Sequence, residues 1–137
     1  MKKQEIILLV EDDIVDQMTV KRALKDINVT NPLRITNNGE EALEYLSNEK
    51  NELPGIILLD LNMPRMNGIE FLRIVKTDNR IKRIPVVVLT TSKEEPDRVN
   101  TFDLGIAGYM IKPVDYLQFV KVIKTINLYW MLSESPG

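Results

Sequence analysis

Five short apolar runs, separated by segments of helical periodicity, constrain the fold of this chain more than any other feature. The runs occupy residues 6–10, 33–36, 56–59, 86–89 and 107–111. Three of them are continuously apolar, as expected for parallel strands that are covered on both faces. Strands that alternate with helices in this way predict an α/β fold, a (βα)₅ doubly wound parallel sheet with helices on both faces.

The segments between the runs repeat apolar residues three or four positions apart, which is the spacing of one helix face. Asp13 is expected to cap the first helix, and Ser92 followed by Glu95 predicts a capping box that opens the fourth. The last helix is expected to start near Asp115. The apolar positions of the first three helices are Val20, Leu24 and Ile27, then Ala42, Leu43 and Leu46, then Ile69, Leu72 and Val75.

The chain has 137 residues, a net charge of -2, and neither Cys nor His. This length predicts one domain over residues 1–132, followed by a flexible tail at 133–137. The charge offers no general attraction for nucleic acid or for acidic membranes. The first apolar run is too short for a signal peptide or a membrane span, so we expect a cytoplasmic protein. Without His and Cys, a bound metal ion should be a hard cation with oxygen ligands, Mg²⁺ or Ca²⁺.

Charged or hydroxyl side chains follow four of the five predicted strands. In an open parallel sheet the carboxyl ends of the strands lie along one edge, where ligands bind. We therefore expect these side chains to converge. In strand order they are Glu11 and Asp12, then Asp60, Thr90 and Lys112.

Converging carboxylates repel one another, by about 4 kcal/mol for two unit charges ~4 Å apart at an effective dielectric near 20. A divalent cation relieves this repulsion, and Mg²⁺ held by carboxylates and water suits phosphoryl chemistry. Asp60 is then the nucleophile of an aspartyl-phosphate step, with Lys112 as cation and Thr90 as hydroxyl donor. Each residue alone could instead be a helix cap, a loop acid, a strand end or a surface charge. Because all of them follow strands of the same predicted sheet, together they favour a phosphoryl-transfer site.

Four motifs make the chain closely resemble the receiver domain of two-component response regulators. They are LLVEDD at 8–13, LDLNMPRMNG at 59–68, VLTTS at 88–92 and GIAGYMIKP at 105–113. The resemblance covers residues 5 to about 126. It implies a flavodoxin-like strand order, 2-1-3-4-5. It also implies a switch that accepts a phosphoryl group and promotes its own phosphorylation and dephosphorylation, rather than a multi-substrate enzyme.

The same resemblance implies a metal site. Asp60 matches the phosphoacceptor, and Glu11 and Asp12 match the acidic pair that holds Mg²⁺, with Mn²⁺ as a substitute. Asp60 and the backbone carbonyl of Asn62 complete the implied protein ligands. Many receivers have Asp where this chain has Glu11, and the longer side chain can still bind metal.

The resemblance also implies a switch. Thr90 matches the switch hydroxyl, Lys112 the phosphate-binding lysine and Tyr109 the switch aromatic. Asn62 and Ser92 match the positions that tune dephosphorylation. The peptide bond that follows Lys112 is usually cis in receivers.

The chain ends soon after the fifth predicted helix, so we expect the output to run through contacts with other proteins. On that helix Tyr116, Phe119, Val120, Ile123, Ile126 and Trp130 form the stripe assigned to the sheet. Apolar residues that fall wholly or partly outside it indicate either a broad core face or a partner face; these are Leu117, Val122, Leu128 and Tyr129. The long helix resembles stand-alone receivers that work with phytochrome-type histidine kinases. Those receivers form homodimers through the fourth helix, fifth strand and fifth helix.

Three alternatives remain open from the sequence. A haloacid-dehalogenase-like phosphohydrolase also uses Asp, Mg²⁺, Thr and Lys, but its nucleophile follows the first strand. A flavodoxin-like cofactor binder shares the fold order, yet Glu11 and Asp12 would repel the phosphate of its cofactor. A receiver that never takes phosphate and acts as a scaffold is the third.

Overall fold

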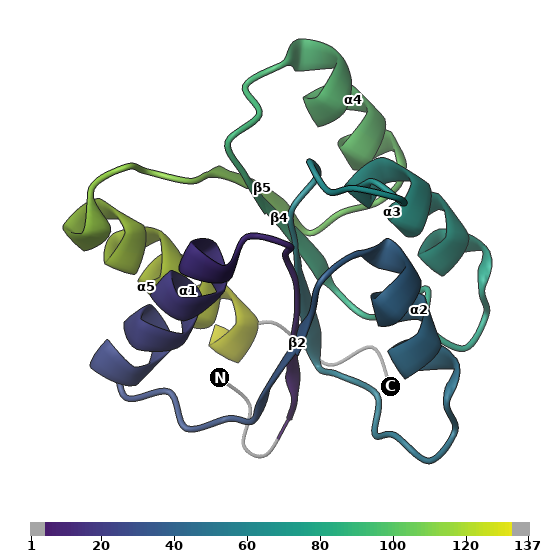
Figure 1. Ribbon diagram of the computed structural model, residues 1–137, viewed down its shortest axis with the longest axis horizontal. Helices are drawn as coiled ribbons and strands as arrows, with labels where there is room; N and C mark the ends of the chain where they lie inside the picture. The colour runs from purple at the N-terminus through teal and green to yellow at the C-terminus, as the bar shows by residue number, and fades with distance from the viewer. Residues whose placement is uncertain (1–4, 133–137) are drawn as a thin grey trace.

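A computed structural model describes residues 5–132, which form one parallel five-stranded sheet with five helices (Figure 1). The strand order is β2-β1-β3-β4-β5, as predicted. The strands are β1 (Ile7–Val10), β2 (Leu33–Thr36), β3 (Ile56–Leu59), β4 (Val86–Thr90) and β5 (Gly108–Ile111). The helices are α1 (Ile14–Asp26), α2 (Gly39–Ser47), α3 (Gly68–Thr77), α4 (Glu95–Asp103) and α5 (Tyr116–Leu132). The tail predicted at 133–137 lies outside the described residues.

Helices cover both faces of the sheet. α1 and α5 cross each other on one face, whereas α2, α3 and α4 lie on the other (Figure 1). The core therefore has two halves. One half packs α1 and α5 against the sheet around Leu9, Leu58 and Ile123. The other half packs α2 and α3 around Leu8, Leu59 and Phe71. Strands β1 and β3 are buried at every position, which explains their continuous apolar sequence.

One helix start follows the expected capping chemistry and one does not. Asp13 caps α1 by accepting from the backbone N–H groups of Val15 and Asp16, as predicted. A capping box predicted from Ser92 is wrong, because α4 begins at Glu95 and no side chain caps it. The Ser92 hydroxyl instead donates to Asp97 Oδ2 at 2.6 Å. Pro96 lies in the first turn, where its missing N–H costs no helical hydrogen bond.

Three details near β5 also differ from expectation. This strand starts at Gly108 rather than at residue 107, and β4 extends to include Thr90. The Lys112–Pro113 bond is trans, as are all peptide bonds within residues 5–132, and not cis as the resemblance implied. The two isomers of an X–Pro bond differ by only about 0.5–1 kcal/mol, so local packing selects between them.

The apolar stripe of α5 lies against the sheet as predicted, with Phe119, Ile123, Ile126 and Trp130 buried. Val122 was expected wholly or partly outside this stripe, and it is partly buried and packs against the same half of the core. Since α5 also packs against α1, its buried face is wider than a sheet-facing stripe alone. By contrast, Leu117, Leu128 and Tyr129 are 69%, 56% and 49% exposed. No helix of residues 5–132 is long and apolar enough to cross a bilayer.

Candidate functional site

Strand pairing brings the predicted site residues to one edge of the sheet. Val10 and Leu59 are register partners in β1 and β3, so the residues that follow them, Glu11 and Asp60, are neighbours. The Asp60 backbone N–H donates to the Val10 carbonyl at 3.0 Å. On the other side, the Lys112 backbone N–H donates to the Thr90 carbonyl at 2.8 Å. The convergence expected from topology is therefore observed.

Glu11, Asp12 and Asp60 form a carboxylate cluster in which one oxygen from each lies within 4.8 Å of the others. Glu11 and Asp60 are only 2% and 7% exposed, whereas Asp12 lies at the surface. The cluster is thus half inside the protein and half open to solvent. An ion could reach it from the Asp12 side.

Lys112 is the cation of this cluster, and its side chain is only 7% exposed. Its ammonium group donates to Glu11 Oε1 and, at 2.9 Å, to Asp16 Oδ2. It lies 3.9 Å from Asp60 Oδ1, which is ion-pair distance. Three carboxylates therefore share one lysine, and its hydrogen bonds go to Glu11 and Asp16 rather than to Asp60.

Burial dominates the titration of the cluster. Desolvation raises the pKa of Glu11 to about 7, with the nearby Asp60 charge adding to the rise and Lys112 opposing it. Burial also raises the pKa of Asp60, although Lys112, Thr90 and the Asn62 backbone N–H favour its charged form. Burial lowers the pKa of Lys112, but the surrounding carboxylates outweigh it and raise the pKa overall. The cluster thus holds more negative charge than one lysine neutralises.

The predicted switch residues lie together behind Asp60. Thr90 is fully buried at the end of β4, its hydroxyl lowers the pKa of Asp60 against the effect of burial, and it accepts from the Ser92 backbone N–H at 3.2 Å. The Tyr109 hydroxyl donates to the Ser92 carbonyl at 3.0 Å. Its ring is partly buried against the α2–α3 half of the core. A chain of contacts therefore runs from Asp60 through Thr90 and Ser92 to Tyr109.

The residues present fit a divalent cation. Three close carboxylates with one shared lysine leave excess negative charge, and one of them carries a pKa raised to about 7. All the donors are hard oxygens, the set that Mg²⁺ and Mn²⁺ prefer over softer metals.

Sequence reasoning missed two residues of the site, both on α1. Asp16 was given no role from the sequence, yet its carboxylate accepts a hydrogen bond from Lys112, near the other end of the chain. Gln17 is buried and donates to the Glu11 carbonyl at 2.7 Å and to Asn37 Oδ1 at 2.8 Å, so it fixes the turn after β1. A polar Gln at a core-facing position of α1 was the available signal.

Comparisons with known proteins agree with this geometry. The response regulator receiver domain model matches residues 7–124. The probable methanogenesis regulatory protein FilR2 of Methanothrix harundinacea is 35% identical over 136 residues, which cover 96% of this chain and 88% of FilR2. Response regulator Rcp1 of Synechocystis sp. is 36% identical over 131 residues, 93% of this chain and 89% of Rcp1.

Solved structures of response regulators also resemble this chain. The phosphorylated cyanobacterial phytochrome response regulator RcpA superposes with a TM-score of 0.90 at 35% identity, covering 98% of this chain and 99% of RcpA. The Mn²⁺-bound form of Rcp1 superposes with a TM-score of 0.89 at 35% identity, covering 97% and 99% of the two chains. The family model matches most of the sequence, and the fold and the carboxylate cluster at the edge of the sheet agree with it. The chain therefore belongs to the response regulator receiver domain family.

Proposed function

We propose that this protein accepts a phosphoryl group on Asp60 from a sensor histidine kinase, in a Mg²⁺-dependent reaction, and signals through changed protein contacts. The observation that carries the proposal is the convergence of Asp60 with two further carboxylates, a buried threonine and a buried lysine. No single motif would bring these groups together. The proposal includes a cytoplasmic location, where an ATP-dependent kinase would meet it.

Glu11, Asp12 and Asp60 would hold the Mg²⁺, with the backbone carbonyl of Asn62 as a further ligand and Mn²⁺ as a substitute. When bound, the ion neutralises phosphate oxygens and the excess charge of the carboxylates. This role is supported by the oxygen-only donor set. It is also supported by the Mn²⁺-bound form of the relative Rcp1.

The chemical step is an in-line displacement at phosphorus. An Asp60 carboxylate oxygen attacks the phosphorus atom of a phosphohistidine, an O–P bond forms and the P–N bond breaks. The histidine nitrogen keeps the electron pair of the broken bond and can take a proton from water. The product is an acyl phosphate on Asp60. Lys112 lies 3.9 Å from Asp60 Oδ1, close enough for its ammonium group to move onto the new phosphate.

The switch follows from the contacts behind Asp60. A phosphoryl group adds roughly -1.5 to -2 charge and three strong acceptor oxygens, which would draw the Thr90 hydroxyl away from the Ser92 N–H. The loop after β4 also carries the Ser92 carbonyl, which accepts from the Tyr109 hydroxyl. Tyr109 would therefore turn inward as this loop moves. The surface formed by α4, β5 and α5 then changes. Moving a population from 1:99 to 99:1 needs about 5.5 kcal/mol, and a few charge-assisted hydrogen bonds can supply it.

Asn62 and Ser92 would tune the lifetime of the phosphorylated form. Neither side chain is a strong base that could activate water. Ser92 is also engaged with Asp97, because its hydroxyl donates to that carboxylate. The protein would therefore act as a switch that promotes its own phosphorylation and dephosphorylation rather than as a multi-substrate enzyme.

The kinase would dock over the first turns of α1. Ile14, Val15 and Met18 are all exposed there, next to the Asp12 side of the carboxylate cluster. Val114, on the loop after Lys112, is fully exposed as well. Apolar residues around the open side of a reactive group suit a partner that must bring its own reactive group close. The relative RcpA, a phytochrome response regulator, supports a phytochrome-type kinase as this partner.

We also propose a homodimer through the surface of α4, β5 and α5. Leu117, Leu128 and Tyr129 expose large apolar surface on α5, and Phe102 exposes more on α4. Val122 is partly buried in the core, so its contribution to this face would be small. Since the same surface carries Tyr109, phosphorylation would change the dimer.

Acetyl phosphate with Mg²⁺ tests the proposed phosphorylation directly. Intact-mass spectrometry should show one phosphoryl group on the wild-type protein and on Asp103→Asn, an exposed control, and none on Asp60→Asn. Full incorporation into Asp60→Asn would refute the assignment. Repeated turnover of p-nitrophenyl phosphate would instead favour a phosphohydrolase.

A further inference from the structure

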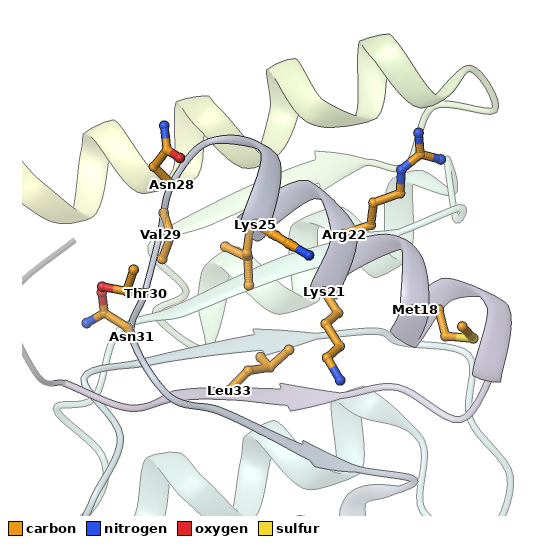
Figure 2. Close-up of a pocket in the computed structure, with 10 residues that line it drawn as sticks. Met18, Lys21, Arg22, Lys25, Asn28, Val29, Thr30, Asn31 and Leu33 are labelled. Carbon is orange, nitrogen blue, oxygen red and sulfur yellow. The ribbon is translucent and has the colours of Figure 1, made fainter.

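A cavity of about 810 Å³ opens between α1 and β2, the strand at one edge of the sheet. Its wall includes the apolar side chains of Leu24, Val29 and Leu33. Figure 2 shows it bounded by α1, the 28–31 loop and β2. None of its lining residues belongs to the carboxylate cluster or its switch residues, and Met18 alone is shared with the proposed kinase-docking surface.

Two lysines of α1 line this cavity, and neither is paired with a carboxylate within the described residues. Among residues 5–132, Lys21 and Lys25 take part in none of the ion pairs. In Figure 2 the Lys21 side chain extends from α1 toward β2. The nearby Arg22 points the other way, toward α5, and its guanidinium stacks 4.0 Å from the centre of the Tyr116 ring. Lys21 and Lys25 are therefore the cations available to a ligand in the cavity.

The edge of β2 beside the cavity offers unpaired backbone groups. Within residues 5–132, β2 pairs with β1 alone, and the Pro32 and Thr36 carbonyls accept from the backbone N–H groups of Ile7 and Glu11. Because backbone groups alternate in direction along a strand, the N–H and C=O groups of Leu33 and Ile35 point away from β1. Ile35 is also 38% exposed, on the same sheet face as Leu33. An extended chain could pair with these groups.

We propose that this edge binds an extended acidic peptide segment of a partner protein, which adds a strand to β2 and places carboxylates on Lys21 and Lys25. The added strand supplies main-chain hydrogen bonds, and the cavity supplies side-chain selectivity. This interaction lies apart from Asp60 and does not depend on its phosphorylation.

Spacing and charge both favour this occupant. Residues two apart on a strand are separated by about 6.6–6.8 Å, and residues four apart on a helix by about 6 Å. Two acidic residues at alternate positions therefore match Lys21 and Lys25. A second copy of this chain is a poor occupant, because it would bring the same lysines and Arg34 against their counterparts.

The test uses a fluorescein-labelled nine-residue peptide with threonine at odd positions, valine at positions 2 and 8, and glutamate at positions 4 and 6. Fluorescence anisotropy should show saturable binding to the wild-type protein that weakens as salt is added. The double variant Lys21→Glu, Lys25→Glu should bind at least about tenfold more weakly. A matched variant, Lys50→Glu with Lys82→Glu, makes the same charge change at exposed positions elsewhere and should bind like wild type.

A second pair of variants tests strand addition separately from charge. Ile35→Pro removes one outward N–H and none of the β1 hydrogen bonds, and proline is tolerated on edge strands. It should weaken peptide binding about tenfold, whereas Ile35→Thr keeps the N–H and should bind like wild type. Circular dichroism and acetyl-phosphate labelling of Asp60 verify that each variant is folded.

Several outcomes would overturn the proposal. Equal binding of a peptide with lysine in place of both glutamates would show that charge does not select the ligand. Binding unaffected by Ile35→Pro would show that no strand is added. Saturable binding of decanoate without binding of the peptide would identify the cavity as a site for small amphiphilic anions.

Discussion

The ammonium group of Lys112 lies 3.9 Å from Asp60 Oδ1, while its hydrogen bonds go to Glu11 and Asp16. This lysine is therefore placed beside the proposed phosphoacceptor but bound to its neighbours. A new phosphate on Asp60 would compete with Glu11 and Asp16 for the same cation. A divalent ion bound by Glu11 would weaken the interaction between Glu11 and Lys112.

The raised pKa of Glu11 makes metal binding depend on pH. A carboxyl group whose pKa rises from 4.5 to about 7 on folding binds more protons in the folded state. The metal-free protein should therefore lose stability as pH rises from 4.5 to 7, by about 3 kcal/mol. Protons and Mg²⁺ compete for Glu11, so the apparent Kd for Mg²⁺ should be about tenfold weaker at pH 6 than at pH 8.

Thermal unfolding with and without Mg²⁺ checks this expectation. The increase in Tm produced by Mg²⁺ should be larger at pH 8 than at pH 6. Glu11→Gln should remove most of that difference, because the amide does not titrate. An increase in Tm that is the same at both pH values in the wild-type protein would contradict the role given to Glu11.

Replacing Lys112 removes the cation shared by three buried or half-buried carboxylates. Lys112→Met should destabilise the metal-free protein by about 3 kcal/mol, because Glu11 and Asp60 keep their burial and lose their partner. Mg²⁺ should stabilise this variant more than it stabilises wild type. Urea unfolding measures both, with exposed Lys121→Met as the control. A variant as stable as wild type without metal would show that Lys112 does not hold the cluster together.

Gly68 allows α3 to start directly against the loop that carries Asp60. A Cβ atom at this position would lie 2.5 Å from the Asp60 carbonyl oxygen and 2.7 Å from Leu61 Cα, so backbone must shift. Gly68→Ala should cost about 2 kcal/mol and slow phosphorylation of Asp60 by acetyl phosphate. Gly108→Ala is the matched control, since its Cβ would meet nothing closer than 3.9 Å. Unchanged stability and rate in Gly68→Ala would contradict this account.

The exposed apolar face of α5 predicts self-association. Light scattering should give a dimer for the wild-type protein and a monomer for Leu117→Glu with Leu128→Glu, because both residues are more than half exposed. The double variant should keep its folded spectrum and its phosphorylation. Ile74→Glu, at an exposed apolar position of α3, is the control and should remain a dimer. A wild-type mass that stays monomeric at all concentrations, with and without acetyl phosphate, would exclude the dimer.

The local sequence pattern was sufficient to predict features that depend on burial or on residues close in the chain. The apolar runs of β1 and β3 could be recognised because strands buried on both faces have no polar alternation. Asp13 could be recognised as a cap because its partners are only two and three residues away. The sequence pattern failed at Ser92, because its hydroxyl binds Asp97 and α4 starts at Glu95 without a side-chain cap.

The sequence by itself therefore determined the fold class, the strand order implied by its family motifs, and the gathering of Glu11, Asp12, Asp60, Thr90 and Lys112 at one edge of the sheet. Only the tertiary structure decided which side chains at that edge bind one another. The bond from Lys112 to Asp16 joins residues 96 positions apart, and its geometry depends on how α1 and the loop after β5 pack. The packing of Val122 into the core likewise depends on the contact between α1 and α5. Periodicity describes one element at a time, so it cannot rank contacts that form only when separate elements meet.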